Sequence, residues 1–324
     1  MTRHGSETQA RPIVDVVLAT YNGAEFVAAQ IDSLLAQTYR SWRLLARDDG
    51  STDGTADILR AYQTRHPERI ILVVDDDGKL GYVGNFSRLL SKSTAAYVAL
   101  CDQDDVWLAD KLSLSMAKLH ALERARGPAT PLLVHTDLRV VDRDLEQIHP
   151  SFWRYRGLDP RSGNDLNRVL AQNVATGCAT VFNSRLKDLC LPVPPEAAAH
   201  DWWIALVAAA FGSTDYVADP TILYRQHRGN TIGAQSFLLR HLLARVVEAY
   251  RDLHEFKRRL HGVFTQASVF RDRYADRFTA ENMMLLNDFA AFPESSAPRR
   301  LLYALKWRIV PPRRFYWLTL ALCI

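Results

Sequence analysis

The chain has few cysteines, and they are not closely paired. Four occur in 324 residues, at Cys101, Cys178, Cys190 and Cys323. A disulfide framework needs cysteines in matched sets, and a zinc site of cysteines needs them at short spacing. The sequence therefore predicts neither, and it indicates a protein of the reducing cytoplasm.

Long hydrophobic runs are absent as well. The longest, 202–211 and 315–324, have ten residues each, whereas a membrane-spanning helix needs about 20. Residues 1–11 are polar and have no apolar centre. They do not resemble a signal peptide, and we expect them to form a disordered lead-in.

The glycine-rich turn of dinucleotide-binding proteins is also missing. The first predicted strand, 14–20, is followed by Tyr21–Asn22–Gly23, at the point where such proteins place Gly-x-Gly-x-x-Gly. This absence counts against an NAD-dependent enzyme.

The net charge is low but unevenly distributed. It is +4 overall, yet the segment 236–324 carries 15 Lys and Arg against 8 Asp and Glu, which is +7 and leaves −3 for the remainder. A basic tail predicts an anionic partner, with membrane lipid as the first candidate and nucleic acid as the second. Aromatic residues interleave with the arginines, which suits the headgroup region of a membrane. We therefore expect a membrane surface and no nucleic acid; the alternative is a solvated helical cap or a dimer contact.

The first part of the chain alternates between strand and helix patterns. Apolar, β-branched runs predict buried strands at 14–20, 42–46, 70–74 and 97–101. Apolar residues at helical spacing predict helices at 26–35, 55–65 and 83–91. This alternation predicts an α/β fold with a Rossmann-like, mainly parallel sheet flanked by helices.

The pattern becomes mixed after residue 127. Strands are predicted at 132–141, 175–182 and 216–224, and a short helix at 202–211. From residue 237 onward helical periodicity dominates, which predicts a helical C-terminal extension.

Carboxylates follow the fourth predicted strand, in Asp102–Gln103–Asp104–Asp105. Open α/β sheets bind ligands at the carboxyl ends of their strands, where Asp102 and Asp104 can converge on one ion. Carboxylate oxygens suit Mg²⁺ or Mn²⁺, and these ions suit phosphate oxygens. The alternative is a polar turn before a helix at 107–122, with Asp105 near its N-cap. Clustered carboxylates repel one another unless a cation is present, which favours the metal.

The second predicted strand ends in Asp48 and Asp49. A carboxylate there could accept hydrogen bonds from a base or a ribose. The alternative is a turn in which Ser51 or Asp53 caps the helix at 55–65. Both arrangements can hold together.

Two further groups have two interpretations each. Asp201 precedes an apolar helix, so it is either the N-cap of that helix or a general base whose pKa is raised in a half-buried aromatic setting. His227 lies between Arg225 and Arg228. It is either structural, or it faces a diphosphate or completes a metal shell.

Together these segments resemble the family 2 glycosyltransferases of the GT-A fold, over residues 12–235. The motifs that carry the resemblance are VLATYNG at 17–23, SLLAQTY at 33–39, DDGSTDGT at 48–55, GYVGN at 81–85 and DQD at 102–104. The segments DQDDVW at 102–107, HDWW at 200–203 and YRQH at 224–227 are similar to the bacterial rhamnosyltransferase branch. That branch builds O-antigen and other cell-wall polysaccharides, usually from dTDP-L-rhamnose.

The resemblance implies a role for each matching residue. Those implied for the nucleotide-sugar donor are Thr20, Tyr21, Asn22, Asp49, Asn85, Asp102, Arg225 and His227. Among them Asp49 would contact the base, and a loop at 81–85 would close over the donor. Asp104 would coordinate Mg²⁺ or Mn²⁺, with Asp102 and His227 as further metal contacts. Asp201 would be the general base.

The implied reaction is transfer with inversion at the anomeric carbon. The metal ion would neutralise the diphosphate leaving group, while Asp201 takes the proton of an acceptor hydroxyl. The implied acceptor is a lipid-linked glycan at the cytoplasmic face of the inner membrane. The implied division is 12–127 for the donor, 128–235 for the acceptor with 151–167 as a variable loop, and 236–324 for the basic helical region.

Other functions fit parts of the pattern. A UDP-hexose donor would use the same fold and mechanism. A non-catalytic sugar-nucleotide-binding module would need the pocket but no base. The run Asp102–Gln103–Asp104–Asp105–Val106 also fits the nucleophile loop of haloacid-dehalogenase phosphatases, although that loop follows the first strand of its fold and this one follows the fourth predicted strand.

Overall fold

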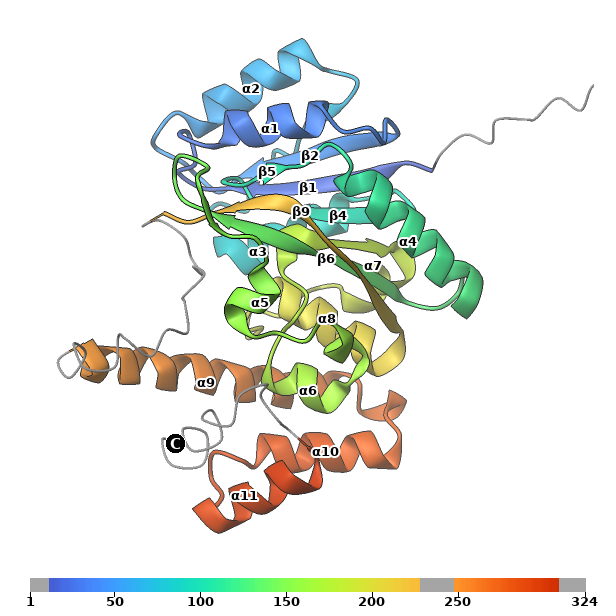
Figure 1. Cartoon of the computed structure of the whole chain (residues 1–324), viewed down its shortest axis with the longest axis vertical. Helices are drawn as coiled ribbons and strands as arrows, with labels where there is room; N and C mark the ends of the chain where they lie inside the picture. Colours follow the sequence, from blue (N-terminus) through green and yellow to red (C-terminus); the bar gives the residue numbers. More distant parts are fainter. Residues whose placement is uncertain (1–11, 228–247, 309–324) are drawn as a thin grey trace, which may run out of the picture.

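The computed structural model describes residues 12–227 and 248–308. The lead-in 1–11, the helical pattern expected at 237–247 and residues 309–324 lie outside the described residues. Within the described chain, nine strands form one sheet in the order β3-β2-β1-β4-β8-β6-β9-β5, with β7 paired to β6 (Figure 1). The expected α/β fold, a mixed sheet flanked by helices, is confirmed.

The first half of the sheet is parallel. Its strands are β1 (Val14–Thr20), β2 (Trp42–Asp48), β3 (Ile70–Leu72) and β4 (Tyr97–Cys101). β1 pairs in parallel with β2 and β4, and β2 pairs in parallel with β3. The segments 20–22, 48–51 and 102–105, which lie at the carboxyl ends of β1, β2 and β4, therefore meet at one edge of the sheet.

The second half is mixed. Its strands are β5 (Val106–Trp107), β6 (Leu132–Val141), β7 (Gln147–His149), β8 (Thr180–Asn183) and β9 (Ser213–Arg225). β8 is antiparallel to both β4 and β6, β9 is parallel to β6, and β5 is antiparallel to β9. Since Val106 pairs with Leu223, the end of β9 is held beside the loop 102–105.

Helices cover both faces of the sheet. One face packs against α1 (Val27–Leu35), α2 (Thr55–Arg65) and α4 (Lys111–Arg126); the other packs against α3 (Gly81–Lys92), α7 (Ser184–Cys190) and α8 (His200–Phe211). Side chains alternate along β1, so Val16 and Leu18 join the first core and Val17 joins the second. Burial on both faces explains why β1 is apolar almost throughout.

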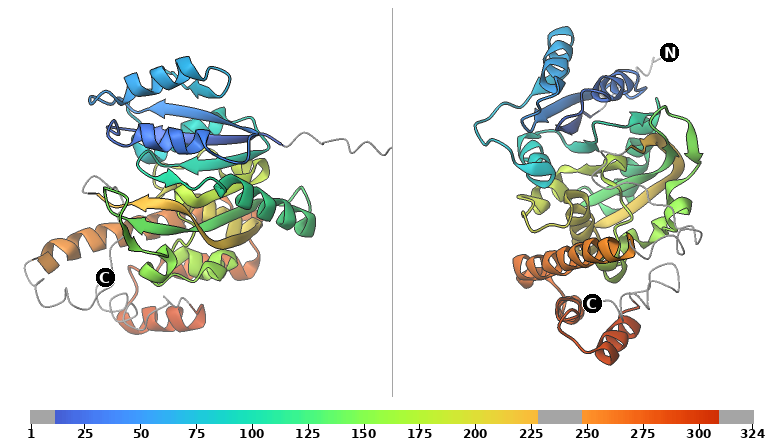
Figure 2. Two further views of the ribbon diagram at one scale, coloured as in Figure 1. Left: turned by 45° about the horizontal axis from the view of Figure 1, so that its top comes forward. Right: turned by 90° about the vertical axis from the view of Figure 1, so that its left-hand side faces the viewer.

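The C-terminal part is helical, as expected. It comprises α9 (Glu248–Arg273), α10 (Ala280–Ala290) and α11 (Ala297–Lys306). These helices lie at the end of the molecule opposite α1 and α2 (Figures 1 and 2). Phe270 of α9 packs on Trp203 of α8 with ring centroids 5.4 Å apart, and both side chains are fully buried. No helix of the described residues is long and apolar enough to cross a membrane.

Two expected elements begin later than predicted. The strand expected at 175–182 starts only at Thr180, because the 3₁₀ turn Gly177–Ala179 precedes it. The helix expected at 107–122 starts at Lys111, because Trp107 belongs to the short strand β5. Both errors fall where the chain turns at the carboxyl edge of the sheet.

The expected acceptor loop at 151–167 is largely helical. It contains α5 (Phe152–Arg156), the 3₁₀ turn Pro160–Asn164 and the start of α6 (Leu166–Ala171). Phe152 and Trp153 lie in the core, with 8% and 5% of their surfaces exposed. These two aromatic side chains therefore do not face solvent, and the acceptor role expected of 151–167 stays a prediction.

Candidate active site

The loop 102–105 joins β4 to β5 and carries three aspartates. Its Gln103 is bound to the end of β1: the Tyr21 backbone N–H donates to Gln103 Oε1 at 2.9 Å, and Gln103 Nε2 donates to the Tyr21 carbonyl at 3.0 Å. Gly23 leaves room for this side chain, since a Cβ at that position would lie 2.3 Å from Gln103 Oε1. The two strand ends are thus fixed to each other.

Asp104 and His227 form a pair at the end of β9. The Nε2 atom of His227 lies 2.9 Å from Asp104 Oδ2, and both side chains are mostly but not fully buried. The imidazole also packs on Phe26, with ring centroids 4.6 Å apart. The structure therefore brings together two of the three residues expected to hold a metal.

Arg225 holds the aspartate loop 102–105 in place through hydrogen bonds. Its backbone N–H donates to Asp105 Oδ1 at 3.1 Å, and its Nε donates to the Asp104 carbonyl at 2.9 Å. The guanidinium also donates to the Arg143 carbonyl and lies over the Phe26 ring. With 6% of its surface exposed, Arg225 positions the loop; the contact with the nucleotide-sugar donor expected of it stays a prediction.

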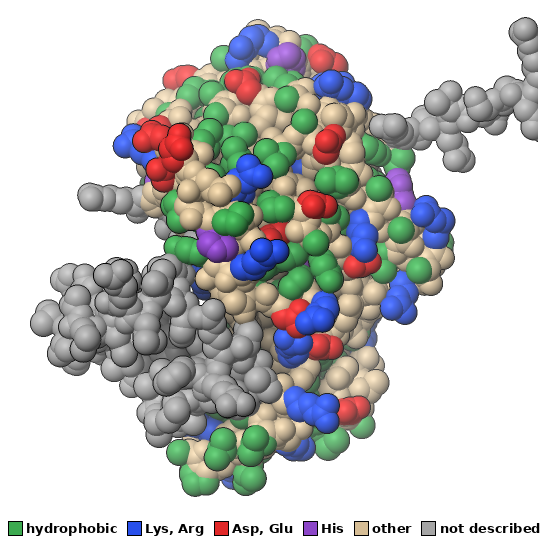
Figure 3. Space-filling view, in the orientation of Figure 1, with side chains coloured by type: hydrophobic (Ala, Val, Ile, Leu, Met, Phe, Trp, Pro, Cys, Tyr) green, Lys and Arg blue, Asp and Glu red, His purple; other side chains and the backbone are tan. Residues whose placement is uncertain are grey.

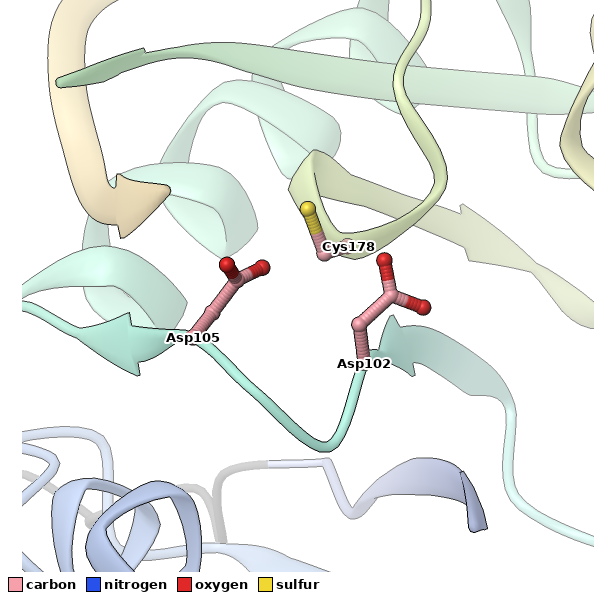
Figure 4. Close-up of side chains that lie close together, drawn as sticks. All are labelled: Asp102, Asp105 and Cys178. Carbon is pink, nitrogen blue, oxygen red and sulfur yellow. The ribbon is translucent and has the colours of Figure 1, made fainter. Parts of the chain in front are cut away.

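Asp105 is buried, although the sequence suggested a helix cap. Its side chain is fully buried, and Oδ2 has no hydrogen-bond partner within the described chain. Donor atoms of Asp105, Asp102 and Cys178 lie within 4.8 Å of one another, with the two carboxylates rising from the two ends of the loop and the thiol from the turn before β8 (Figure 4). Burial, then the charges of Asp104 and Asp102, raise the pKa of Asp105.

Asp102 is affected by the charges of both Asp104 and Asp201. Burial raises its pKa to about 7, with further contributions from the charges of Asp104 and Asp201. Two further carboxylates thus act on Asp102, one from the same loop and one from α8. Such an arrangement of negative charge at one sheet edge favours a cation.

Asp201 lies in the first turn of α8. The Gly177 backbone N–H donates to Asp201 Oδ2 at 2.8 Å, and Oδ1 accepts the N–H of Trp202 at 2.7 Å. The N-cap position belongs to Ala199 instead. Burial raises the pKa of Asp201 to about 6 against the opposing effect of the Gly177 hydrogen bond. A half-buried carboxylate of this acidity can accept a proton near neutral pH.

The residues fit a hard divalent cation. Carboxylate oxygens of Asp102 and Asp104 with an imidazole nitrogen of His227 are a donor set that Mn²⁺ or Mg²⁺ accepts. The orphaned Oδ2 of Asp105 and the raised pKa values of Asp102 and Asp105 mark uncompensated negative charge at this point. A divalent cation would compensate it.

The residues expected at the nucleotide occupy the ends of β1 and β2. Thr20 is buried and donates to Asp48 Oδ1 at 2.9 Å. Asn22 Oδ1 accepts the Thr52 N–H, and Ser51 Oγ accepts the Asn22 N–H at 2.8 Å. Tyr21 is exposed, and the Lys79 ammonium lies over its ring. Ser51 therefore ties the two strand ends together rather than capping α2, whereas Asp53 accepts from the Thr55 backbone N–H near the start of that helix.

A cleft of about 220 Å³ opens beside these strand ends. Its lining includes Asp48, Leu72, Val74 and Asp75. It lies between β2, β3 and α2, so Asp48 rather than Asp49 borders it.

Asp49 and Asn85 are turned inward. Asp49 has 2% of its surface exposed; it accepts from Arg47 and from the backbone N–H groups of Leu80 and Gly81, each at 2.8 Å. Asn85 is equally buried and donates to the Arg47 carbonyl at 3.2 Å. The base contact expected of Asp49 and the donor contact expected of Asn85 stay predictions, and either contact requires these internal bonds to rearrange.

The segment 81–85 is the first part of α3, so the expectation of a loop there was wrong. The N–H groups of Leu80 and Gly81 at the start of this helix bind the Asp49 carboxylate, which the N-terminal dipole favours.

Sequence reasoning missed two residues near Asp201. Tyr82 donates its hydroxyl to the Ala198 carbonyl at 2.8 Å, and burial, followed by the charge of Asp201, raises its pKa. His200 stacks on Phe86 with ring centroids 3.8 Å apart, and its buried nitrogens have no partner in the described part of the chain. Tyr82 and Phe86 are four residues apart on α3, a spacing that could have indicated one shared face.

A parallel half of the sheet with an Asp-x-Asp loop at its carboxyl edge, joined to a mixed half, is the fold of the GT-A class of glycosyltransferases. Solved structures agree with this fold. TarS of S. aureus in complex with UDP-GlcNAc superposes with a TM-score of 0.55 at 14% identity, covering 94% of this chain and 90% of that one. The mannosyltransferase PcManGT from Pyrobaculum calidifontis in complex with GDP-Man and Mn²⁺ gives 0.51 at 18% identity, covering 97% and 86%.

The sequence comparisons define the family. The model described as Glycosyl transferase family 2 matches residues 15–148. The dTDP-rhamnosyl transferase RfbG of Shigella flexneri is 26% identical over 237 residues, which are 67% of this chain and 74% of that protein. The chain belongs to the family 2 glycosyltransferases, and it is a glycosyltransferase.

Proposed function

We propose that this glycosyltransferase moves a sugar from a nucleotide diphosphate to an acceptor hydroxyl, with inversion, and that Asp201 is its general base. One observation carries the proposal. Asp201, from α8, accepts the Gly177 backbone N–H at 2.8 Å, and the thiol of the next residue, Cys178, lies within 4.8 Å of the Asp102 carboxylate. A candidate proton acceptor thus lies close to a candidate metal ligand although 99 positions separate them in the sequence.

Asp201 has the properties that the base step requires. Its pKa of about 6 leaves it ionised at neutral pH while keeping it basic enough to accept a hydroxyl proton. The Gly177 N–H holds one oxygen and fixes the direction of the carboxylate. The acceptor oxygen loses its proton to Asp201 as it bonds to the anomeric carbon, and the bond to the leaving diphosphate breaks on the opposite face.

The leaving-group side consists of Asp102, Asp104 and His227. These residues would hold Mg²⁺ or Mn²⁺, which when bound neutralises the diphosphate. Arg225 keeps Asp104 in place through its bond to the Asp104 carbonyl. The mannosyltransferase structure with Mn²⁺ supports this choice of ion.

The donor that we place first is dTDP-L-rhamnose. The likeness to the dTDP-rhamnosyl transferase RfbG supports it; the TarS complex with UDP-GlcNAc keeps a UDP-hexose as the second candidate. In both cases residues 12–127 would hold the nucleotide, residues 128–235 the acceptor, and Thr20, Tyr21 and Asn22 would line the nucleotide pocket. A thermal-shift screen of both donors, with and without Mn²⁺, separates the two candidates.

The acceptor in this proposal is a lipid-linked glycan of a bacterial surface polysaccharide, modified at the cytoplasmic face of the inner membrane. The glucosyltransferase WfgD of Escherichia coli, whose name gives a diphosphoundecaprenol-linked acceptor, is 31% identical over 107 residues and supports this choice.

The test is the substitution Asp201→Asn, which keeps the shape and removes the base. We expect transfer to fall by about 10²–10⁴-fold, the usual contribution of a general base, while donor binding measured by calorimetry stays within twofold (about 0.4 kcal/mol). Asp215→Asn, a partly exposed aspartate on β9 that pairs with Lys118, is the control. Transfer at the wild-type rate in Asp201→Asn would remove the base assignment, and a wild type that only binds donor would indicate a non-catalytic module. A trapped aspartyl phosphate on Asp102 would indicate the phosphatase instead.

A further inference from the structure

Helix α11 is fixed to the protein by one face. Ala304 is buried, and Arg300 donates to the carbonyls of Phe292 and Pro293 at 3.1 and 2.8 Å. Trp307, just past the helix, donates to Asp288 of α10 at 2.7 Å. The Asn167 amide in turn donates to the Trp307 carbonyl at 2.6 Å. The orientation of α11 is therefore set by specific contacts with α10 and α6.

The opposite face of the same helix is apolar and exposed. Leu301, Leu302 and Leu305 have 48%, 64% and 64% of their surfaces exposed. At 100° per residue these side chains form one stripe that points away from Arg300 and Ala304. Apolar side chains gather at this end of the molecule (Figure 3). We call Leu301, Leu302 and Leu305 the leucine stripe.

Positive charge borders the leucine stripe. Arg299 and Lys306 of α11 and Arg308 just past its end are all exposed, and Lys306 pairs with Asp288 of α10 at 2.7 Å. From residue 297 to the end, the chain has six Lys and Arg and no Asp or Glu. The last sixteen residues, 309–324, contribute two of these arginines and the run Phe315–Tyr316–Trp317. Basic residues next to an apolar stripe are typical of helices that lie in the plane of a membrane surface.

Two other occupants match the stripe less well. A second copy of the chain packed on it by two-fold symmetry would bring the same basic residues together, and like charges repel. A nucleic acid would leave the three leucines against phosphate and water. An anionic bilayer complements both the leucines and the charges.

We propose that the leucine stripe of α11, with its basic border, docks the protein on the surface of an anionic lipid bilayer. The proposal deepens the proposed function, because a lipid-linked acceptor would lie at that surface, but its test needs no transfer reaction. The leucines enter the headgroup and acyl boundary, and Arg299 and Arg308 contact lipid phosphates. The bilayer is bound from one side and is not crossed.

The test uses the full chain and sedimentation with two kinds of vesicle. We expect binding to phosphatidylcholine vesicles that contain phosphatidylglycerol, and much weaker binding to phosphatidylcholine alone. The triple variant Leu301→Asn, Leu302→Asn, Leu305→Asn should bind about a hundredfold less tightly, because three exposed apolar side chains no longer enter the lipid. The double variant Arg299→Gln, Arg308→Gln should bind the anionic vesicles about tenfold less tightly.

The matched control is a triple variant of exposed apolar residues on other surfaces, Leu114→Asn, Leu145→Asn and Ile148→Asn. It should bind vesicles like the wild type, and thermal unfolding should confirm that each variant is folded.

Wild-type protein that does not bind anionic vesicles would overturn the proposal, as would a leucine-stripe variant that binds normally. If the wild type forms a dimer and does not bind vesicles, and the leucine-stripe variant is a monomer, the stripe would be assigned to self-association instead. Donor binding in solution reports on the transferase site separately, so the two proposals fail in different assays.

Discussion

Burial is the main influence on the pKa of Asp201. The carboxylate lies in the first turn of α8, where the helix dipole and the Gly177 N–H favour its charged form, yet desolvation is the larger effect and leaves its pKa at about 6. The base must be ionised to accept a proton. Activity should therefore be present above this pKa and should be lost as the pH falls through it.

This gives a prediction for the pH profile. We expect kcat/KM to be level above pH 6 and to fall about tenfold per unit below it, with an inflection near the Asp201 pKa of about 6. The measurement is initial rate at low donor concentration with saturating metal. The residual activity of Asp201→Asn should lack this acid limb; an acid limb unchanged in that variant would assign the titration to another group.

A second prediction concerns Mn²⁺ binding by the pair of Asp104 and His227. The substitutions Asp104→Asn and His227→Gln should each weaken Mn²⁺ binding by at least about tenfold, because each removes one proposed ligand. Mn²⁺ binding is measured by electron paramagnetic resonance without donor or acceptor. Asp110→Asn, an exposed aspartate bonded to Thr38, is the control. Equal Mn²⁺ affinity in all three variants would exclude Asp104 and His227 as ligands.

One buried carboxylate, that of Asp15, connects the amino ends of β1, β2 and β4. Asp15 of β1 is fully buried and accepts two hydrogen bonds from Arg43 of β2, at 2.6 and 3.2 Å. It also accepts from the Ser93 hydroxyl and from the backbone N–H groups of Thr94 and Ala95 before β4. Burial opposes its charge, but these bonds, with Arg43 first, lower its pKa. Asp15 thus joins three strands at their amino ends.

We therefore expect Asp15→Asn to lower the free energy of unfolding by about 2–3 kcal/mol at neutral pH, since an amide cannot accept all of these bonds. A group with a lowered folded pKa stabilises above its unfolded pKa of about 3.9 and loses this effect as pH falls through the folded value. The difference between wild type and variant should narrow below pH 4 in urea unfolding. Asp57→Asn, in an exposed pair with Arg60, should change stability by less than about 0.5 kcal/mol; a similar loss in both variants would contradict this role of Asp15.

The elements that the sequence predicted best are those fixed by their own periodicity. The bounds of β1, α2 and β6 agree with the expected 14–20, 55–65 and 132–141. In each, the apolar residues repeat with the period of a strand or a helix, and turn-forming or polar residues mark the ends. Such local patterns do not depend on distant partners.

What the sequence did not predict depends on partners far along the chain. Asp49 is held by Leu80 and Gly81, and Asp105 by Arg225, which is 120 positions away. Cys178 joins Asp102 and Asp105 only because a 3₁₀ turn replaces the first part of the expected strand. The candidate site was therefore predictable in its residue types and its edge of the sheet, while the partners of its individual oxygens were not.

On the scale of the whole molecule, the C-terminal helices share a core with the sheet. Phe270 of α9 and Phe289 of α10 belong to the same buried cluster as Val17 of β1 and Trp203 of α8. The Trp203 indole also donates to the Cys190 carbonyl at 3.1 Å, which anchors α8 two residues after Asp201. Packing between α8 and α9 thus supports the part of α8 that carries the candidate base.

We expect Phe270→Ala to lower the free energy of unfolding by about 3–5 kcal/mol, because it opens a cavity against Trp203. If α9 and α10 fold together with the sheet, far-ultraviolet dichroism and tryptophan fluorescence should give one coincident transition in urea. Transfer activity should fall more than donor binding, since the loosened helix carries the proposed base Asp201, whereas the proposed donor residues lie on α3 and at the ends of β1, β2, β4 and β9. Met284→Ala, on an exposed position of α10, is the control and should be nearly neutral. Two separate transitions in the wild type would show instead that the helical region is a domain of its own, and the link between α9 and the candidate base would then be lost.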